Sequence, residues 1–584
     1  MDTKENIEIE KKNSFLLIKI NGHYLSSRYN PEKEAIRSFE KIKEKNVYIF
    51  FGIGSGYLFN LIYNSNNFKQ KKIFIIEKNN DLICLLKKEF CFDFNFSNII
   101  LINEISELNK VLVYFEFEDL FSFEIIKNQV ETEILYKDFF NEIEKKFFWY
   151  INEIKQNFLT KLILEKEWNK NSIINFKEII NANSINFLVN KFKNVPGILI
   201  SAGPSLDKNI NELKDYVDKC VIVAVDTALK TCKLQNIKPD FIYSLDCNRA
   251  NFSDFLNVQT DELNLIFDFV VYPDIITNFR GRKFFSITGH EKNINNNYFV
   301  EYIEFYNWLK SFLNFDLPYI QTGGSVAHSA FDFLRICGCN PIILIGQDLA
   351  YSNFKHHTIT KLNYEGINKF FTLETEFFNI SLNKNLLKIK GYYDEFVFTD
   401  SVLYGYLKWF EDAGEKLNKF IELINSTEGG AEIKNFQKIR LSDALKKYCK
   451  NTLDKNFINN SNDNIFKENK NLILDKIIEK INEFELVREK CLTFMKKIEE
   501  NYKNKIVLNK DEINAAEKNI LETEKFFIKI FLKDYKYRLL ALKMNKNISE
   551  NEYNYLSAVI FFKLMIEAVD YFQPLFQNLY NKLK

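Results

Sequence analysis

Short apolar runs alternate with stretches of helical spacing over residues 1–165. Phe15–Ile20, Val47–Phe51 and Ile73–Ile76 each have the length and content of a buried strand. Apolar residues spaced three and four apart then cover Ile134–Lys166. The pattern predicts an N-terminal Rossmann-like α/β domain that ends in a long helical connector.

The alternation returns over residues 175–440. Segments between the apolar runs have helical spacing, for example Val326–Cys337. Strands separated by helices predict a parallel or mostly parallel sheet, and therefore a central α/β domain. The expected strands are Gly197–Ser201, Val221–Val225, Phe241–Leu245, Leu265–Val271 and Ile342–Ile345.

Residues 441–584 have helical spacing without a strand signal of comparable strength. Helices are expected over residues 467–500, 511–533 and 550–581, packed as an antiparallel bundle that either binds a partner or is a structural appendage. The asparagine-rich stretch Asn459–Asn464 is typical of a linker. The predicted fold class is therefore α/β, with two Rossmann-like domains followed by an α-helical domain.

Composition and charge narrow the class of protein. The 584 residues carry a net charge of +1, so no general electrostatic attraction to nucleic acid or membranes is expected. The nine cysteines include no CxxC pair, which is typical of free thiols in a reducing compartment. The N-terminal segment is polar, and no apolar run reaches the length of a membrane span. We therefore expect a cytoplasmic protein without a transmembrane segment.

A glycine-rich segment in the first region has the layout of a nucleoside site. Gly52-Ile53-Gly54-Ser55-Gly56 follows one expected strand, and Glu77 ends the next. Glycines allow a ligand to approach the backbone, and the carboxylate can accept hydrogen bonds from ribose hydroxyls. No motif for methyl transfer follows. A structural remnant of a nucleoside-binding fold is favoured over a working site.

The strongest local motif of the second region is the turn Gly203-Pro204-Ser205-Leu206, which follows a strand and leads into a helix. Gly203 permits a tight turn and close approach of a ligand, and Pro204 stiffens that turn. Ser205 is expected to cap the helix or to donate to a phosphate. Free N–H groups at the helix start would favour an anion.

Polar residues end the next two strands. Asp226 and Thr227 follow one strand, and Asp246 follows the other. Side chains at the carboxyl ends of parallel strands face the ligand side of an open sheet. Together with the turn at Gly203, they predict a crevice lined for a nucleotide.

Two further glycine segments point to the same chemistry. Thr322-Gly323-Gly324-Ser325 runs directly into a helix and forms a second helix start suited to an anion. Glu428-Gly429 combines a carboxylate that could orient a substrate hydroxyl with a residue that permits close approach. A plain turn remains the alternative for the second segment.

A histidine pair follows the last strand of this region. The strand leads into Gly346-Gln347-Asp348, with Tyr351 three residues further on, and then into His356-His357. Imidazole is the usual general base near neutral pH, so either histidine is a candidate.

Read together, these segments resemble the motility accessory factor (Maf) family of flagellin glycosyltransferases, in the family's order, over residues 190–435. More distantly, the region is similar to bacterial sialyltransferases. The matching pieces are Gly203-Pro204-Ser205-Leu206-Asp207, Pro239-Asp240-Phe241 with Asp246, Thr322-Gly323-Gly324-Ser325-Val326, Gly346-Gln347-Asp348-Leu349-Ala350-Tyr351 with His357, and Thr427-Glu428-Gly429-Gly430-Ala431.

The resemblance implies a role for each segment. The Gly203–Leu206 turn would hold the phosphate or ribose of a cytidine monophosphate (CMP) donor, and Thr322–Ser325 its base or phosphate. Asp348 and Tyr351 would take part in catalysis, with Tyr351 bound to the departing phosphate. His357 would be the base, with His356 as its competitor.

The implied reaction transfers pseudaminic, legionaminic or a related nonulosonic acid from its CMP ester to a Ser or Thr of flagellin. No permanently bound cofactor and no metal ion are expected, and the oligomeric state stays open. Two alternatives remain. One is a pterin pyrophosphokinase, in which Asp226, Asp246 and Asp348 would bind magnesium. The other is a flagellin-binding factor without enzymatic activity.

Overall fold

The computed structural model describes residues 6–12, 15–42, 45–65, 70–294, 297–315, 317, 319–351, 386–460, 464–507, 509–544 and 548–584. The chain forms two compact units. The first contains Met1–Ile163 and Lys292–Tyr298, and the second contains Leu164–Glu291 and Phe299–Lys584. Within the described ranges, no helix has both the length and the apolar character needed to cross a membrane.

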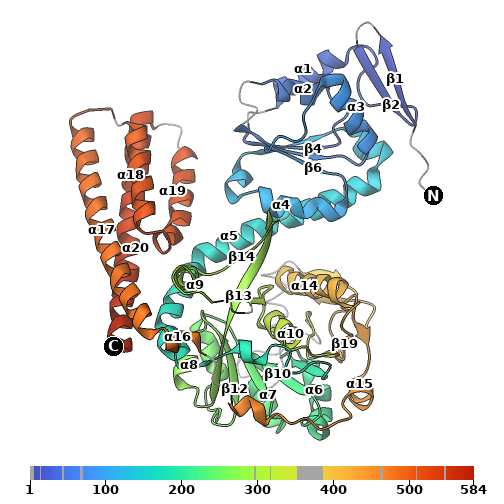
Figure 1. The fold of residues 1–584 in the computed structure, drawn as a ribbon. Coiled ribbons are helices and arrows are strands. Elements are labelled where there is room, and N and C mark those ends of the chain that lie inside the picture. Colours follow the sequence, from blue (N-terminus) through green and yellow to red (C-terminus); the bar gives the residue numbers. More distant parts are fainter. Residues whose placement is uncertain are drawn as a thin grey trace, which may run out of the picture. The chain divides into compact units, whose positions relative to one another are not determined.

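A four-stranded parallel sheet in the order β6-β5-β4-β7 forms the centre of the first unit. Figure 1 shows α1 and α2 on one face of this sheet and α4 with the start of α5 on the other. The bounds are β4 Val47–Phe51, β5 Lys72–Ile76, β6 Ile99–Ile102, β7 Phe123–Lys127, α1 Pro31–Lys41, α2 Tyr57–Tyr63, α3 Asn80–Phe90, α4 Lys110–Tyr114 and α5 Lys137–Ile179.

The strand β4 shows why the sheet is covered twice. Tyr48 and Phe50 belong to the core on one face, and Ile49 and Phe51 belong to the core on the other. Successive side chains of a strand point to opposite faces, so an unbroken apolar run must be buried on both. A small antiparallel sheet of β1 Ile7–Lys12, β2 Phe15–Ile20 and β3 His23–Tyr24 completes the unit.

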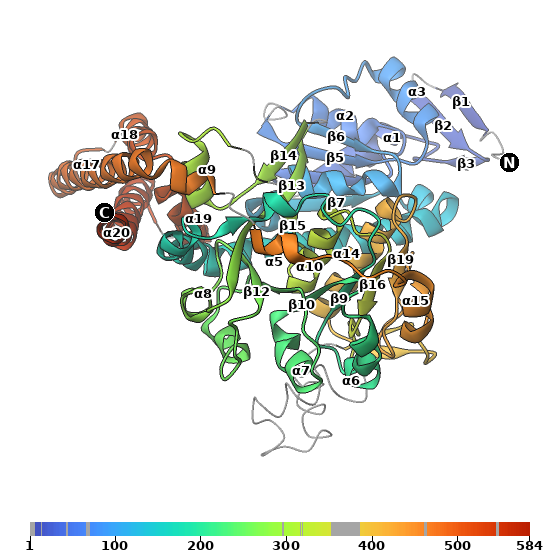
Figure 2. The same ribbon diagram turned by 60° about the horizontal axis from the view of Figure 1, so that its bottom comes forward.

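The second unit is built on an eleven-stranded sheet in the order β14-β13-β12-β11-β10-β9-β16-β19-β20, with β15 and β8 paired to β13. The chain runs outward from β9 to β12 and returns to the other side of β9 at β16, as Figure 2 shows. This reversal is the topological switch point, where open α/β sheets bind their ligands. The bounds are β8 Asn183–Ser184, β9 Gly197–Ile200, β10 Val221–Val225, β11 Phe241–Ser244, β12 Asn264–Asp268, β13 Arg282–Ile294, β14 Asn297–Glu301, β15 Tyr319–Gln321, β16 Ile342–Ile345, β17 Leu387–Ile389, β18 Val397–Thr399, β19 Leu423–Asn425 and β20 Gln437–Lys438.

Helices cover this sheet and bring the polar loops to its edge. The helix α10 packs against β9, β10 and β11, and every residue from Ala327 to Leu334 is buried. The helix bounds are α6 Leu206–Asn209, α7 Leu229–Leu234, α8 Pro273–Asn278, α9 Glu304–Lys310, α10 Val326–Ile336, α14 Ser401–Leu417 and α15 Leu441–Tyr448.

The C-terminal helices belong to the same compact unit as the second sheet. Phe466 is fully buried, and its ring contacts Phe176 of α5 and Phe285 of β13 at centroid distances of 5.3 and 5.4 Å. The helix bounds are α16 Ile465–Glu468, α17 Lys470–Lys503, α18 Lys510–Thr523, α19 Leu532–Met544 and α20 Glu550–Leu583.

The predicted fold class is confirmed: parallel α/β sheets are followed by a helical C-terminal region. The division into domains at 1–165, 175–440 and 441–584 stays a prediction. The predicted helix over 511–533 is wrong, because α18 ends at Thr523. Glu524 accepts hydrogen bonds from the backbone N–H groups of Phe527 and Ile528 at 2.7 and 2.9 Å, and this turn starts a new helical segment.

Candidate functional site

Two of the predicted motifs meet at the switch point of the second sheet. The turn after β9 carries Ser205, and the turn after β16 carries Asp348. The Ser205 hydroxyl donates to Oδ1 of Asp348 at 2.5 Å, and the Ser205 N–H lies 3.2 Å from Oδ2. Beside them, the Ser201 hydroxyl donates to Oε1 of Gln347 at 2.5 Å. Residues more than 140 positions apart in the chain therefore form one buried polar cluster.

The structure explains why position 203 is a glycine. A Cβ atom at this position would lie 2.3 Å from Oδ1 of Asp348 and 2.5 Å from the Gly346 carbonyl oxygen. No side chain fits at these distances, so glycine is needed because the protein's own Asp348 approaches the backbone. The close approach of a ligand to Gly203 stays a prediction.

The expected helix cap at Ser205 is wrong. The helix α6 has only four residues, and the Ser205 side chain makes no capping hydrogen bond to it. Its hydroxyl donates to Asp348 instead. The same carboxylate accepts the Ser205 N–H, which was expected to bind an anion. Leu206 is fully buried in the core, whereas Gly203 and Pro204 are partly exposed. The turn is thus a rigid edge of the site rather than an open helix start.

A third predicted motif joins the same cluster from the turn after β19. The Ala431 N–H donates to the backbone oxygen of Asp348 at 2.7 Å. Gly430 has a φ of 76°, and a Cβ there would lie 2.2 Å from that same oxygen. Gly429 is different, because a Cβ on it would make ordinary contacts of 3.7 Å with Ser205 Cβ and 3.8 Å with Lys208 Nζ. Gly429 therefore faces space beside Ser205.

Sequence reasoning missed Lys208, which brings a positive charge to this turn. Its ammonium group donates to the Glu428 backbone oxygen at 2.6 Å. The Glu428 carboxylate accepts a hydrogen bond of 2.8 Å from the Tyr393 hydroxyl. The only signal for Lys208 was its place in the first turn after the Gly203–Leu206 motif. Lys208 therefore places a positive charge at the edge of the turn.

Asp226 and Thr227 lie at the carboxyl end of β10, next to β9. Asp226 is fully buried and accepts hydrogen bonds from the Ser244 hydroxyl at 2.7 Å and the Thr227 N–H at 2.8 Å. Burial, together with the nearby charge of Asp254, raises the pKa of Asp226 to about 7. Asp246 is half-buried at the end of β11, where it accepts from the Asn248 N–H at 3.0 Å.

The glycine loop before α10 forms the predicted helix start. The Ser325 hydroxyl caps α10 by accepting a hydrogen bond from the Ala327 N–H at 3.3 Å. Thr322 and Gly323 are partly exposed, and Gly324 is exposed with a φ of 87°. The loop lies against α14 through Gly323 and Gly324.

Tyr351 is nearly buried, and its hydroxyl donates to Oδ2 of Asp400 at 2.7 Å. To bind a departing phosphate as predicted, the hydroxyl would have to exchange this bond. His357 and its competitor His356 lie outside the described residues. Over the ranges that the structure describes, no three His, Cys, Asp or Glu side chains are grouped so that they could hold a metal ion.

The glycine segment of the first unit is occupied by two of the protein's own carboxyl groups. Glu77, at the end of β5, accepts from the Ile53 N–H at 3.0 Å. Glu131, in the short helical segment Val130–Leu135 after β7, accepts from the Gly54 N–H at 2.7 Å. Both are fully buried, and burial together with the neighbouring Glu77 raises the pKa of Glu131 well above its usual value.

The space beside these glycines is filled. A Cβ on Gly52 would lie 2.6 Å from Oε2 of Glu131, and one on Gly54 would lie 2.4 Å from Nδ2 of Asn128. Sequence reasoning found Glu77 but missed Glu131, which has no motif of its own. The contacts favour the structural remnant over a working nucleoside site.

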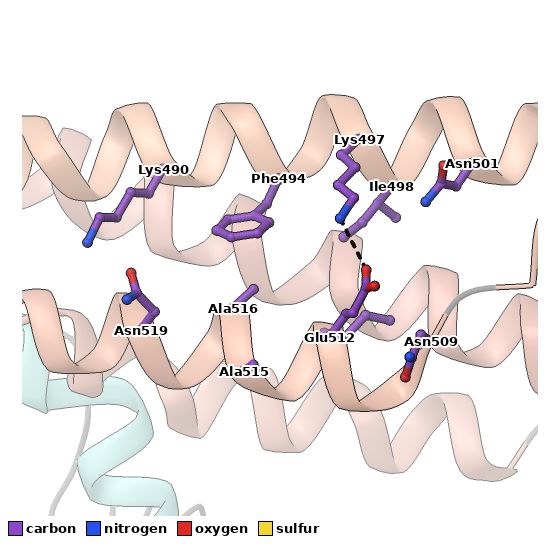
Figure 3. Close-up of a pocket in the computed structure, with 11 residues that line it drawn as sticks. Lys490, Phe494, Lys497, Ile498, Asn501, Asn509, Glu512, Ala515, Ala516 and Asn519 are labelled. Atoms are coloured by element: carbon purple, nitrogen blue, oxygen red, sulfur yellow. Dashed lines mark hydrogen bonds and ion pairs between the residues drawn. The ribbon is translucent and has the colours of Figure 1, made fainter.

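A separate pocket of about 480 Å³ lies between α17 and α18, and Figure 3 shows its lining. Phe494 and Ile498 come from one helix and Ala516 from the other, with the ion pair of Lys497 and Glu512 at 3.1 Å across it. It shares no residue with the cluster around Asp348.

Comparison with known proteins agrees with this architecture. Residues 170–354 match the family described as 6-hydroxymethylpterin diphosphokinase MptE-like. An uncharacterized protein of Treponema pallidum (strain Nichols) is 30% identical over 95 residues, which cover 16% of this chain and 43% of that protein. The match thus spans less than half of that relative.

Among solved structures, the chain is similar to the Maf glycosyltransferase from Magnetospirillum magneticum AMB-1. The TM-score is 0.57 at 13% sequence identity, and the match covers 100% of this chain and 91% of that one. The resemblance that the ordered motifs indicated is therefore confirmed for the fold. Along its whole length the chain has the fold of the Maf glycosyltransferase, with an MptE-like segment at its centre.

Proposed function

We propose that this protein is a glycosyltransferase that moves a nonulosonic acid from a CMP-activated donor to a Ser or Thr hydroxyl of flagellin. One observation carries the proposal. Three motifs from distant parts of the chain converge on Asp348 at the switch point of a sheet, in a fold shared with a glycosyltransferase. Ligands of open α/β sheets bind at such points.

The donor would lie along the carboxyl edge of β11, β10, β9, β16 and β19. Thr227, Asp246 and Gly429 are partly exposed there and can face a nucleotide. Ser205 and Asp348 would support this edge and would not bind the donor directly, because their polar atoms are bound to each other. Lys208 places a positive charge beside the turn, where a phosphate would carry its negative charge.

In the proposed reaction, the acceptor hydroxyl oxygen attacks the anomeric carbon of the nonulosonic acid. The bond from that carbon to the phosphate oxygen breaks, and CMP leaves with the electron pair. His357 takes the proton of the acceptor hydroxyl. Charges placed in advance beside a leaving phosphate stabilise the transition state, and this is the role assigned to Lys208. The donor already carries a good leaving group, so we expect transfer to continue in the presence of EDTA.

An intact-mass spectrum of flagellin tests the proposal. Flagellin would be co-expressed with this protein in cells that make a CMP-nonulosonate, beside the variants Gly429→Trp and Ser311→Trp. An indole at position 429 projects next to Ser205 and blocks the site without strain at the α-carbon. Ser311 is exposed at the end of α9 and is the matched control.

Mass increments of one acidic nine-carbon sugar are expected with wild type and Ser311→Trp, and they should be lost with Gly429→Trp. Unmodified flagellin that still co-purifies with this protein would instead favour the non-enzymatic binding factor.

The match of residues 170–354 to a diphosphokinase family keeps a second candidate in place. That reaction needs ATP, magnesium and a pterin. Asp226 and Asp348, two of the carboxylates it would use, hold Ser244 and Ser205. Magnesium-dependent consumption of ATP with 6-hydroxymethylpterin, and no sugar transfer, would replace the proposed function with this one.

A further inference from the structure

The glycine loop Thr322–Ser325 rests on two aromatic rings. His328, in the first turn of α10, is fully buried, and its ring stacks on Trp409 of α14 with centroids 4.3 Å apart. A Cβ on Gly323 would lie 2.3 Å from Cδ1 of Trp409 and 2.5 Å from Nδ1 of His328. The loop backbone is therefore in direct contact with both rings, and Gly323 is glycine because of them.

A single hydrogen bond assigns the tautomer of His328. Its Nε2 lies 3.2 Å from the Tyr406 backbone oxygen, which can only accept, so Nε2 carries the hydrogen. Nδ1 packs against the backbone of Gly323 and, among the described residues, is buried without a hydrogen-bond partner. Burial lowers the pKa of His328 to about 3, so the ring is neutral at any physiological pH. A permanently neutral ring is suited to holding a backbone and not to moving a proton.

The N-terminal end of α14 contacts Tyr351, a second residue of the predicted site. Asp400 caps α14, and its Oδ1 accepts from the Val402 and Leu403 N–H groups, each at 2.9 Å. Its Oδ2 accepts the hydroxyl of Tyr351. One helix thus contacts both the loop before α10 and the tyrosine after β16.

We propose that His328 and Trp409 are positioning residues, which hold the Thr322–Ser325 loop in the shape that binds the donor's nucleotide, while α14 sets this loop relative to Tyr351. The inference rests on the proposed function and deepens it. The alternative is that His328 only fills the core. The two ideas differ in one respect: a core residue affects stability, whereas a positioning residue affects nucleotide affinity at equal stability.

The variant His328→Phe separates these effects, because it keeps a ring on Trp409 and removes both nitrogens. The binding of CMP to the full-length protein would be measured by calorimetry, and KM and kcat by transfer from a CMP-nonulosonate. We expect the Kd for CMP and the KM for the donor to rise about tenfold. This is the equivalent of losing one hydrogen bond, the one between Nε2 and the Tyr406 backbone oxygen. The kcat at saturating donor should change much less.

Phe331→Leu is the matched control. Phe331 lies one turn further along α10, is also buried, and packs edge-on against Trp409 at 6.0 Å. Its replacement removes core packing between the same two helices, so Tm should fall while the Kd for CMP stays at the wild-type value.

Three outcomes would overturn the inference. The first is wild-type CMP affinity in His328→Phe. The second is an equal loss of affinity in Phe331→Leu, which would mean that helix packing alone is responsible. The third is a wild-type protein that binds no CMP and transfers no sugar, and this result would also remove the proposed function. A loss of CMP affinity confined to His328→Phe supports the inference.

Discussion

The two glycine turns of this protein have the same topological position and opposite surroundings. Each follows the first strand of a parallel sheet, β4 or β9, and lies beside the strand across the switch point, β7 or β16. In each, a carboxyl group from the second strand's turn accepts a backbone N–H of the first: Glu131 from Gly54, and Asp348 from Ser205.

The two turns differ in how much of their surface stays exposed. In the first unit Glu77 and Glu131 are fully buried, and Asn128 takes the space beside Gly54. In the second unit the shorter Asp348 fixes the turn from within, and Gly203 and Gly429 stay partly exposed. The comparison teaches that strand topology provides a possible site, and that the side chains packed beside the turn decide whether it is closed.

The largest effect should come from the proposed base of the open site. Replacing His357 by Ala should lower turnover by about 10²–10⁴ if it removes the acceptor proton. Single-turnover transfer from a CMP-nonulosonate measures this rate. His356→Ala is the neighbouring control, and an unchanged rate in His357→Ala would assign the proton transfer to another group.

A second substitution tests whether Asp348 holds the turns after β9 and β19 together. Asp348→Ala removes the partner of the Ser205 hydroxyl and N–H, so we expect the free energy of unfolding to fall by about 2–3 kcal/mol, with loss of transfer. Urea unfolding of the second unit measures the stability. Asp348→Asn keeps the shape and should lose less. Full stability and activity in the Ala variant would show that the turns hold without this carboxylate.

The buried Glu131 beside the first glycine turn should make the free energy of unfolding depend on pH. The folded pKa of Glu131 is raised, so its stabilising contribution is complete below the unfolded pKa and is lost as pH rises toward the folded value. Over that window wild type should lose up to about 1.4 kcal/mol per pH unit relative to Glu131→Gln, which cannot ionise. Thermal unfolding of both proteins from pH 4 upward measures the difference. Parallel curves would mean that Glu131 is ionised in the folded protein.

The smallest expected effect is no effect. S-adenosylmethionine or adenosine should leave the unfolding temperature of wild type unchanged, because the protein's own side chains fill the space beside the first glycine turn. CMP should raise it through the second unit. A rise that grows with the concentration of S-adenosylmethionine would show that the first site opens, and would break the comparison.

Part of this could be predicted from the sequence. Strands buried on both faces, such as β4, β10 and β16, are unbroken apolar runs, so their positions follow from hydrophobicity alone. Glycine motifs located the turns because glycine is needed where two backbones approach. Local patterns could not show that Asp348 binds Ser205 or that Glu131 binds Gly54, since these contacts join residues 143 and 77 positions apart. The short strand β19 was missed because three residues give no periodicity.

The junction at Asp348 also limits how this site can change over evolutionary time or in the laboratory. The turn after β16 carries Asp348, and the turns after β9 and β19 contact it, so a new sequence in one turn must remain compatible with the other two. Transplanting a single loop from a relative with a different donor preference should fail, whereas moving all three together should succeed. On the proposed function, we therefore expect a change of donor to require libraries that vary the three segments jointly.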